Sequence, residues 1–129
     1  MHEIRKIDVN KDIPKKMREE AGKAGLDFYG TRQVTFGYYI DGKLVAFCGY
    51  RPTREEGVCR FKNGWVEPEY RGMGLYSQLD KVRMESVKDE GYTKIVAKTT
   101  PMMTPIYRKR GWHIKRNFSD GGASFFLEI

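Results

Sequence analysis

Residues 58–91 combine a strand, a glycine-containing turn and a helix, and this unit restricts the fold more than any other part of the chain. Residues 58–66 alternate as a half-buried strand does, with Cys59, Phe61 and Trp65 on one face and cationic side chains on the other. The pattern predicts a strand that buries its apolar face and leads directly into the turn.

The turn and the helix after it have the features of an anion-binding site. Apolar residues recur there at helical spacing, namely Leu75, Leu79, Val82 and Val87, and Gly91 follows where a helix ends. Arg71, Gly72 and Gly74 lie just before the helix. The first N–H groups of a helix lack intrahelical partners, and glycines let an anion approach the backbone. Because an arginine adds a fork that pairs with phosphate oxygens, we expect a ligand that carries phosphates.

Two common phosphate-binding turns do not fit this segment. The Walker pattern needs Lys-Ser or Lys-Thr after its last glycine, whereas Leu75 and Tyr76 follow Gly74. The dinucleotide fingerprint needs three glycines at the start of a parallel sheet, and the segment has two. A different kind of phosphate-binding turn is therefore indicated.

The segment resembles the acetyl-CoA-binding motif of the GNAT family of N-acetyltransferases, Val-x-Pro-x-Tyr-Arg-x-x-Gly-x-Gly/Ala-x-x-Leu. The matching residues are Val66, Pro68, Tyr70, Arg71, Gly74 and Leu79. The resemblance implies that acetyl-CoA is held by Arg71, Gly72, Met73, Gly74, Leu75, Tyr76 and Ser77. Tyr76 departs from the family, which prefers glycine or alanine there. Its ring would either turn away from the ligand or narrow the site.

A second segment, residues 106–112, resembles the family's Leu-Tyr-x-x-x-Gly-Phe motif. By this resemblance Tyr107 is the proton donor to the leaving thiolate, and its alternative role is to pack the short helix. Thr100 lies where the family commonly has an asparagine, at the cofactor site. The two motifs occur in the family's order, and the resemblance extends from about residue 35 to the C-terminus.

Asn63 and Gly64 interrupt the strand before the turn. A hairpin there would leave too short a return before Pro68, so a bulge or a close backbone approach is the better interpretation of Gly64. A bulge would splay this strand from its neighbour and open a slot. The resemblance assigns the backbone amides of Gly64, Trp65 and Val66 the task of polarising the acyl carbonyl.

The remaining segments predict a single α/β (α+β) domain over residues 1–129. We expect a mixed, mostly antiparallel sheet of six to seven strands, flanked by three to four helices. A helix capped by Asp12 should run to about Ala24, and residues 33–50 should form a hairpin around Asp41-Gly42. Residues 93–98 should form a strand parallel to the central one, followed by a hairpin of residues 113–118 and 123–129.

Residues 26–32 show no helical or strand periodicity. In GNAT proteins the corresponding segment covers the acceptor pocket. Phe28, Tyr29 and Gly30 are therefore candidates to line that pocket, with ordinary packing as the alternative. The central strand carries Arg60 and Lys62 but no carboxylate, so we assign no general base.

Composition limits the cellular setting and the cofactors. Two cysteines indicate a reducing environment, and two histidines and two cysteines without metal-ligand spacing predict no metal. No apolar run is long enough to span a membrane, and the N-terminus does not resemble a signal peptide, so we expect a cytoplasmic protein without a membrane partner.

The formal net charge is +7, and a run without acidic residues carries much of it. The run comprises Lys94, Lys98, Arg108, Lys109, Arg110, Lys115 and Arg116. We expect an acetyl-CoA-dependent N-acetyltransferase whose acceptor is a small-molecule or peptide amine, more readily an acidic one. The alternative is a binding module on the same scaffold, directed to nucleic acid by its basic surface. A homodimer is left open.

Overall fold

The computed structural model describes residues 1–28 and 32–129, with the side chain of Asn63 excepted. Its strands are β1 (His2–Ile7), β2 (Val34–Ile40), β3 (Lys43–Pro52), β4 (Val58–Val66), β5 (Lys94–Thr99), β6 (His113–Asn117) and β7 (Ala123–Glu128). Its helices are α1 (Lys15–Lys23), α2 (Leu75–Asp89) and α3 (Thr104–Lys109), with a short 3₁₀ turn, η1 (Pro68–Tyr70). Tyr29 and Gly30, two candidates for the acceptor pocket, lie outside the described residues.

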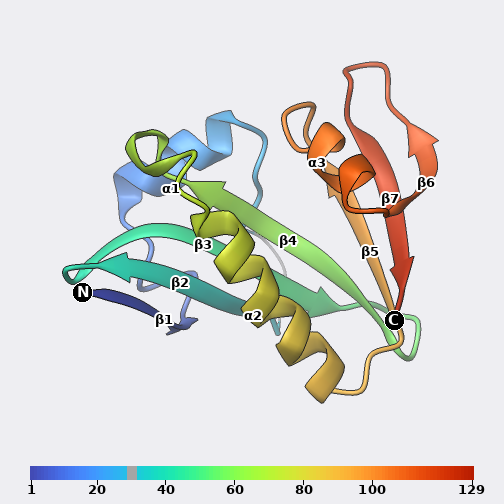
Figure 1. Ribbon diagram of the computed structural model, residues 1–129, viewed down its shortest axis with the longest axis horizontal. Coiled ribbons are helices and arrows are strands. Elements are labelled where there is room, and N and C mark those ends of the chain that lie inside the picture. Colours follow the sequence, from blue (N-terminus) through green and yellow to red (C-terminus); the bar gives the residue numbers. More distant parts are fainter. Residues whose placement is uncertain (29–31) are drawn as a thin grey trace.

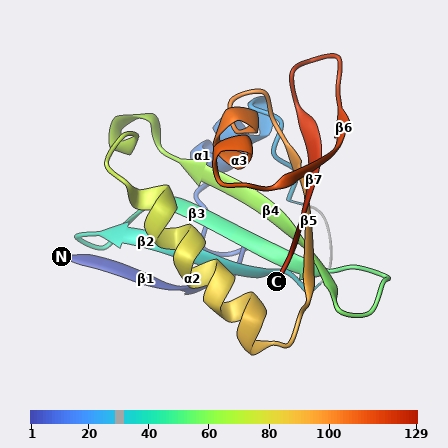
Figure 2. The same ribbon diagram turned by 45° about the vertical axis from the view of Figure 1, so that its right-hand side comes forward.

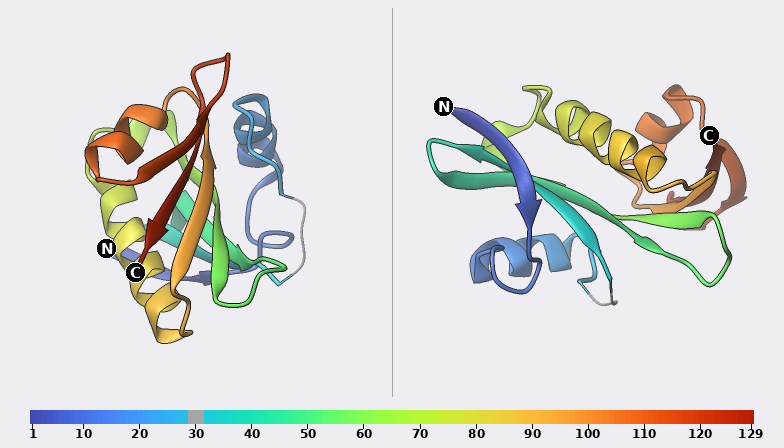
Figure 3. Two further views of the ribbon diagram at one scale, coloured as in Figure 1. Left: turned by 90° about the vertical axis from the view of Figure 1, so that its right-hand side faces the viewer. Right: turned by 90° about the horizontal axis from the view of Figure 1, so that it is seen from below.

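The strands form one seven-stranded sheet in the order β1-β2-β3-β4-β5-β7-β6 within the described chain. All neighbouring pairs are antiparallel except β4 and β5, which are parallel because α2 connects them. Helix α1 covers one face of the sheet, and α2 and α3 cover the other (Figure 3). The predicted mixed, mostly antiparallel sheet is confirmed. No helix in the described ranges is both long and apolar enough to cross a membrane.

The hydrophobic core is divided by the sheet. On one face Leu79 and Val87 of α2 pack with Phe125, and on the other Met17 of α1 packs with Phe47. All five side chains are buried, and each large apolar side chain contributes about 1.5–3 kcal/mol relative to an exposed position.

The predicted cap of the first helix was wrong. Helix α1 begins at Lys15 after Pro14, and no side chain caps it. The Asp12 carboxylate instead accepts a hydrogen bond of 2.7 Å from the Asp8 N–H, which closes the turn before the helix. An aspartate side chain can accept a hydrogen bond from any nearby free backbone N–H. Here the N–H of the preceding turn takes the Asp12 carboxylate, and the first N–H groups of α1 do not.

Strand β4 contains the predicted bulge. Lys62 pairs with Gly49 and Trp65 with Phe47, so β4 has one more residue than β3 between these two pairs. An extra residue reverses the in-and-out alternation, because side chains on a strand repeat every two residues. Phe61 therefore packs on the α2 face, whereas Trp65 packs on the α1 face. The expectation that Cys59, Phe61 and Trp65 share one face was wrong for Trp65.

The parallel pair of β4 and β5 is short. It runs only from Val58 and Lys94 to Arg60 and Val96. Beyond Arg60 the two strands diverge toward the end of the sheet at which α3 lies (Figures 1 and 2). The sheet is therefore open between β4 and β5 next to the bulge, where the sequence predicted a slot.

Candidate active site

Two cavities meet at the bulge of β4. The turn pocket, of about 860 Å³, is lined by Val66, Arg71, Gly72, Gly74, Leu75 and Ser77, among others. The splay pocket, of about 630 Å³, lies between the diverging strands and is lined by Arg51, Arg60, Lys98, Thr99 and Tyr107, among others. Gly64, Tyr76 and Thr100 line both. One ligand in the turn pocket can therefore reach a second ligand in the splay pocket.

The turn pocket has the geometry expected of a phosphate site. Gly72 and Gly74 have φ angles of 80° and 78°, a backbone region that glycine adopts without strain. Helix α2 begins directly after them, so its first N–H groups are free of intrahelical partners. The Arg71 Nε donates to the Val66 carbonyl at 2.9 Å, and its guanidinium lies 4.9 Å from the centre of the Trp65 ring. These contacts hold Arg71 at the pocket, and its terminal guanidinium nitrogens stay exposed.

A second cation lies at the rim of the turn pocket. Arg110 donates to Asp80 Oδ2 at 2.7 Å and to Ser77 Oγ at 2.9 Å. These bonds tie the end of α3 to the first two turns of α2. Met73, by contrast, is 54% exposed and lines neither pocket. Its side chain therefore borders neither cavity, and its role in cofactor binding stays a prediction.

Tyr76 is directed into the junction of the two pockets. A Cβ atom added to Gly64 would lie 2.8 Å from Cε2 of the Tyr76 ring, so the ring packs directly on the bulge. Its hydroxyl accepts a hydrogen bond of 2.7 Å from Arg83. Burial raises the pKa of Tyr76 well above its ordinary value, although the positive charge of Arg83 acts in the opposite direction. Of the two predicted alternatives, the structure supports a ring that narrows the site.

Arg83 was missed by the sequence interpretation. Its side chain is 1% exposed, and it donates to the Gly49 carbonyl at 3.2 Å and to Asp80 at 2.7 Å. Its guanidinium lies 3.7 Å from the centre of the Phe61 ring. Arg83 occupies the buried helical position that was given to Val82, which is only half-buried. The sequence did carry a signal of this burial, because Arg83 lies four residues after Leu79 and four residues before Val87.

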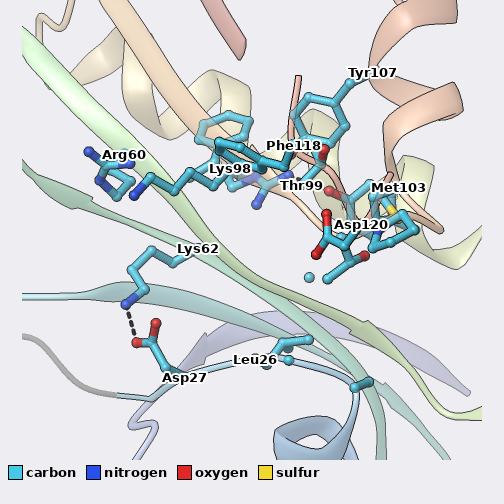
Figure 4. Close-up of a pocket in the computed structure, with 18 of the residues that line it drawn as sticks. Leu26, Asp27, Arg60, Lys62, Lys98, Thr99, Met103, Tyr107, Phe118 and Asp120 are labelled. Carbon is cyan, nitrogen blue, oxygen red and sulfur yellow. Dashed lines mark hydrogen bonds and ion pairs between the residues drawn. The ribbon is translucent and has the colours of Figure 1, made fainter. Parts of the chain in front are cut away.

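Tyr107 lies on α3 and extends into the splay pocket toward Thr99 and Phe118 (Figure 4). The residue is 7% exposed, and its ring packs against Trp112 with the ring centres 4.8 Å apart. Its hydroxyl has no hydrogen-bond partner among the described residues. The phenol is therefore held rigidly while its polar end remains available to a ligand.

Two connecting segments, one after α1 and one between β6 and β7, supply the carboxylates of the splay pocket. Asp27 and Asp120 line the pocket, whereas Glu55, Glu56 and Glu67 line neither pocket. Asp27 forms an ion pair of 2.5 Å with Lys62. Asp120 Oδ1 accepts the Gly122 N–H at 2.8 Å and closes its own turn. Within the described ranges no group of side chains is arranged to hold a metal ion.

Phe28 does not line either pocket. Its ring packs toward Phe47, with centres 6.0 Å apart, under the Arg18 guanidinium. Ordinary packing, the alternative considered for this residue, is what the structure shows. Leu26 from the same segment does line both pockets.

The sequence model of the Acetyltransferase (GNAT) family matches residues 2–112. The chain belongs to the GNAT acetyltransferase family. It is thus an acetyl-CoA-dependent N-acetyltransferase, as the two motifs predicted. The family match begins at residue 2, whereas the resemblance noticed in the sequence began only near residue 35. The first strand and helix therefore belong to the GNAT domain as well.

Solved GNAT structures share this fold throughout. An IAA acetyltransferase from Bacillus cereus is 18% identical, with a TM-score of 0.73 and 100% of both chains covered. A GNAT acetyltransferase from Elizabethkingia anophelis with acetyl-CoA bound is 15% identical, with a TM-score of 0.71 over 99% of this chain and 98% of that one. The PaiA N-acetyltransferase from Thermoplasma acidophilum, in complex with coenzyme A, is 13% identical, with a TM-score of 0.74 over 100% and 99%. No curated protein matches the sequence.

Proposed function

We propose that this GNAT enzyme transfers an acetyl group from acetyl-CoA in the turn pocket to an amine in the splay pocket. The observation that carries the proposal is the junction of the two pockets at Gly64, Tyr76 and Thr100. A direct transfer requires the thioester and the amine to meet at one point, and a shared wall provides it.

The residues of the turn pocket fit the phosphates of the donor. The free N–H groups at the start of α2, the Arg71 fork and the Arg110 guanidinium would bind them. When bound, acetyl-CoA supplies the activated acetyl group as a thioester. A Cβ atom at Gly72 or Gly74 would meet no other atom within 4 Å, so the turn leaves space beside the backbone for an anion. Thr100 borders this cavity at the position where the family commonly has an asparagine.

Carbonyl polarisation is assigned to the backbone of β4. Beyond Arg60 this strand has no pairing with β5, so its N–H groups on that side can be directed into the slot. The Glu67 N–H donates to the Val45 carbonyl of β3, and N–H groups alternate along a strand, so the amides of Gly64 and Val66 are the candidates and that of Trp65 faces β3. Backbone donors at fixed positions stabilise the negative charge that develops on the carbonyl oxygen during acyl transfer. The bulge is therefore a functional feature of the strand.

Two side chains are assigned the proton transfers. Tyr107 donates its hydroxyl proton to the leaving thiolate, since that hydroxyl is unpartnered within the described chain and lies in the splay pocket. Asp120 accepts a proton from the attacking amine, directly or through water. Its carboxylate faces the same pocket, and one N–H bond leaves it with free acceptor capacity (Figure 4).

The acceptor is proposed to be a small-molecule or peptide amine, with acidic amines preferred. A thioester-turnover assay tests the function. The enzyme is incubated with acetyl-CoA and each member of a panel of amines that includes DNA and RNA, and a thiol reagent measures the free CoA that is released. The protein's own cysteines do not interfere at neutral pH, because burial raises the pKa of both Cys48 and Cys59 to about 11. CoA release that depends on an amine supports the proposal. Nucleic-acid binding without CoA release from any amine would favour the binding-module alternative.

A further inference from the structure

Cationic side chains from three neighbouring strands form a row on one face of the sheet. Arg51 of β3 is the direct cross-strand partner of Arg60 of β4, and Arg60 is paired with Val96 of β5. Lys98 lies two residues beyond Val96, so it is on the same face. We call Arg51, Arg60 and Lys98 the cationic row. All three line the splay pocket.

The cationic row is not neutralised by the protein. Among the described residues no carboxylate forms an ion pair with Arg51, Arg60 or Lys98. The Nε of Arg51 is buried without a hydrogen-bond partner. Like charges directly opposite each other on neighbouring strands destabilise a sheet, and a buried donor without a partner costs further free energy. An anionic ligand between these side chains would relieve the repulsion.

The other end of the splay pocket has the opposite polarity. Arg60 and Lys98 lie at one end of the view in Figure 4, and Asp120 and Tyr107 lie toward the other. Thr99 lies between them. Of the other charged residues that line the pocket, Asp27 is paired with Lys62, and Arg83 is paired with Asp80. The charges that carry no ion pair in the described chain therefore give the pocket a positive end at the cationic row and a negative end at Asp120.

We propose that the splay pocket binds a zwitterionic acceptor, with its anionic group on the cationic row and its amine at the Asp120 end. This inference rests on the proposed function and names the class of acceptor. A cavity of about 630 Å³ fits a small amino acid or the end of a peptide, since such cavities hold small ligands. Arginine pairs with carboxylate and phosphate alike. A polyamine would place a cation against the row and be repelled.

Matched amines test the charge requirement. The rate of CoA release is measured with β-alanine, 4-aminobutyrate and 6-aminohexanoate, each against the unbranched amine of the same chain length without a carboxylate. A phosphonate series of aminoalkyl chains separates phosphate from carboxylate recognition. We expect kcat/KM to be higher for the anionic member by roughly tenfold or more, the value of one charge-assisted hydrogen bond. Equal rates, or faster reaction of the plain amines, would overturn the inference and leave the acetyltransferase function intact.

Variants of the row connect the preference to these residues. Arg60→Gln and Lys98→Gln should each reduce the anionic-to-neutral ratio of kcat/KM by roughly tenfold, mainly through KM for the acceptor. Lys115→Gln removes the same charge from an exposed position on β6 outside both pockets and should leave the ratio unchanged. An unchanged ratio in both row variants would refute the assigned site.

A binding measurement is independent of turnover. Glutarate is unreactive and carries carboxylates, so millimolar glutarate should raise the Tm of the wild-type protein and have a smaller effect on Arg60→Gln. Without ligand, Arg60→Gln should be at least as stable as the wild type, because it relieves the repulsion with Arg51. A lower Tm for unliganded Arg60→Gln would mean that the row has a structural role and would count against the inference. If no amine releases CoA but glutarate binds as described, the proposed function fails and the anion site stands.

Discussion

Gly64→Ala is the most informative single substitution, because it adds one methyl group at the junction of the two pockets. The new Cβ would lie 2.8 Å from Cε2 of Tyr76 and 3.3 Å from its hydroxyl oxygen. The ring cannot retreat freely, since its hydroxyl is bound to the buried Arg83. Overpacking of this kind costs roughly 1–3 kcal/mol of unfolding free energy. At roughly 4 °C per kcal/mol for a domain of this size, the Tm should fall by roughly 4–12 °C.

A double-mutant cycle isolates the contact. Urea or thermal unfolding is measured for Gly64→Ala, Tyr76→Ala and the double variant. If the ring is the cause, Gly64→Ala should cost almost nothing in the Tyr76→Ala background, and the coupling should be roughly as large as the single-variant cost. Tyr76→Phe keeps the ring but removes the hydroxyl that holds it at Arg83, so Gly64→Ala should cost less there than in the wild type and more than in the Tyr76→Ala background. Gly22→Ala in α1 is the control, since its Cβ would meet no other atom within 4 Å and alanine favours a helix.

Two results would refute this reasoning. An equal cost of Gly64→Ala with and without the Tyr76 ring would show that the methyl group disturbs the backbone of the bulge and not the ring. A Gly64→Ala protein as stable as the wild type would show that Tyr76 can leave the junction easily, so that it does not narrow the site.

Three further predictions concern the cofactor, the proton donor and the thiols. Acetyl-CoA at a hundred times its Kd should stabilise the wild type by about 2.7 kcal/mol, and Arg71→Ala should lose most of this gain in a thermal-shift assay with little change in the unliganded Tm; an undiminished shift would exclude Arg71 from binding. Tyr107→Phe should reduce kcat by roughly 10²-fold with little change in cofactor affinity, and full activity would leave Tyr107 a packing role. Burial raises the pKa of the Cys48 and Cys59 thiols to about 11, so unfolded thiols ionise first and the free energy of unfolding should fall as the pH rises from about 9 through 11. Urea titrations at several pH values measure this, and a Cys48→Ala/Cys59→Ala variant should show a shallower fall.

Features that depend on a few adjacent residues could be predicted from the sequence. Asp41 and Gly42 form the turn of the first hairpin with φ angles of 50° and 81°, and the glycines before α2 have positive φ as the motif required. The bulge at Gly64 followed from how few residues remained before Pro68. Tyr107 was located by its motif and does lie in a pocket. Local backbone preference and covalent spacing determine these features, so they can be predicted from the sequence alone.

Only the tertiary structure decided which side chains meet. The bulge moved Trp65 to the opposite face from Phe61, because one extra residue shifts a repeat of two. The pairing of Arg51 with Arg60 depends on the register of two strands joined by a polar loop, and the position of Lys98 beside them depends on a parallel pair that α2 connects. The burial of Arg83 could not be predicted for a related reason. A cation on the apolar face of a helix can be buried only where hydrogen-bond acceptors surround it, and here the Gly49 carbonyl, the Tyr76 hydroxyl and the Asp80 carboxylate come from separate turns and strands. Register and long-range packing are set by the whole sheet, and local periodicity does not contain them.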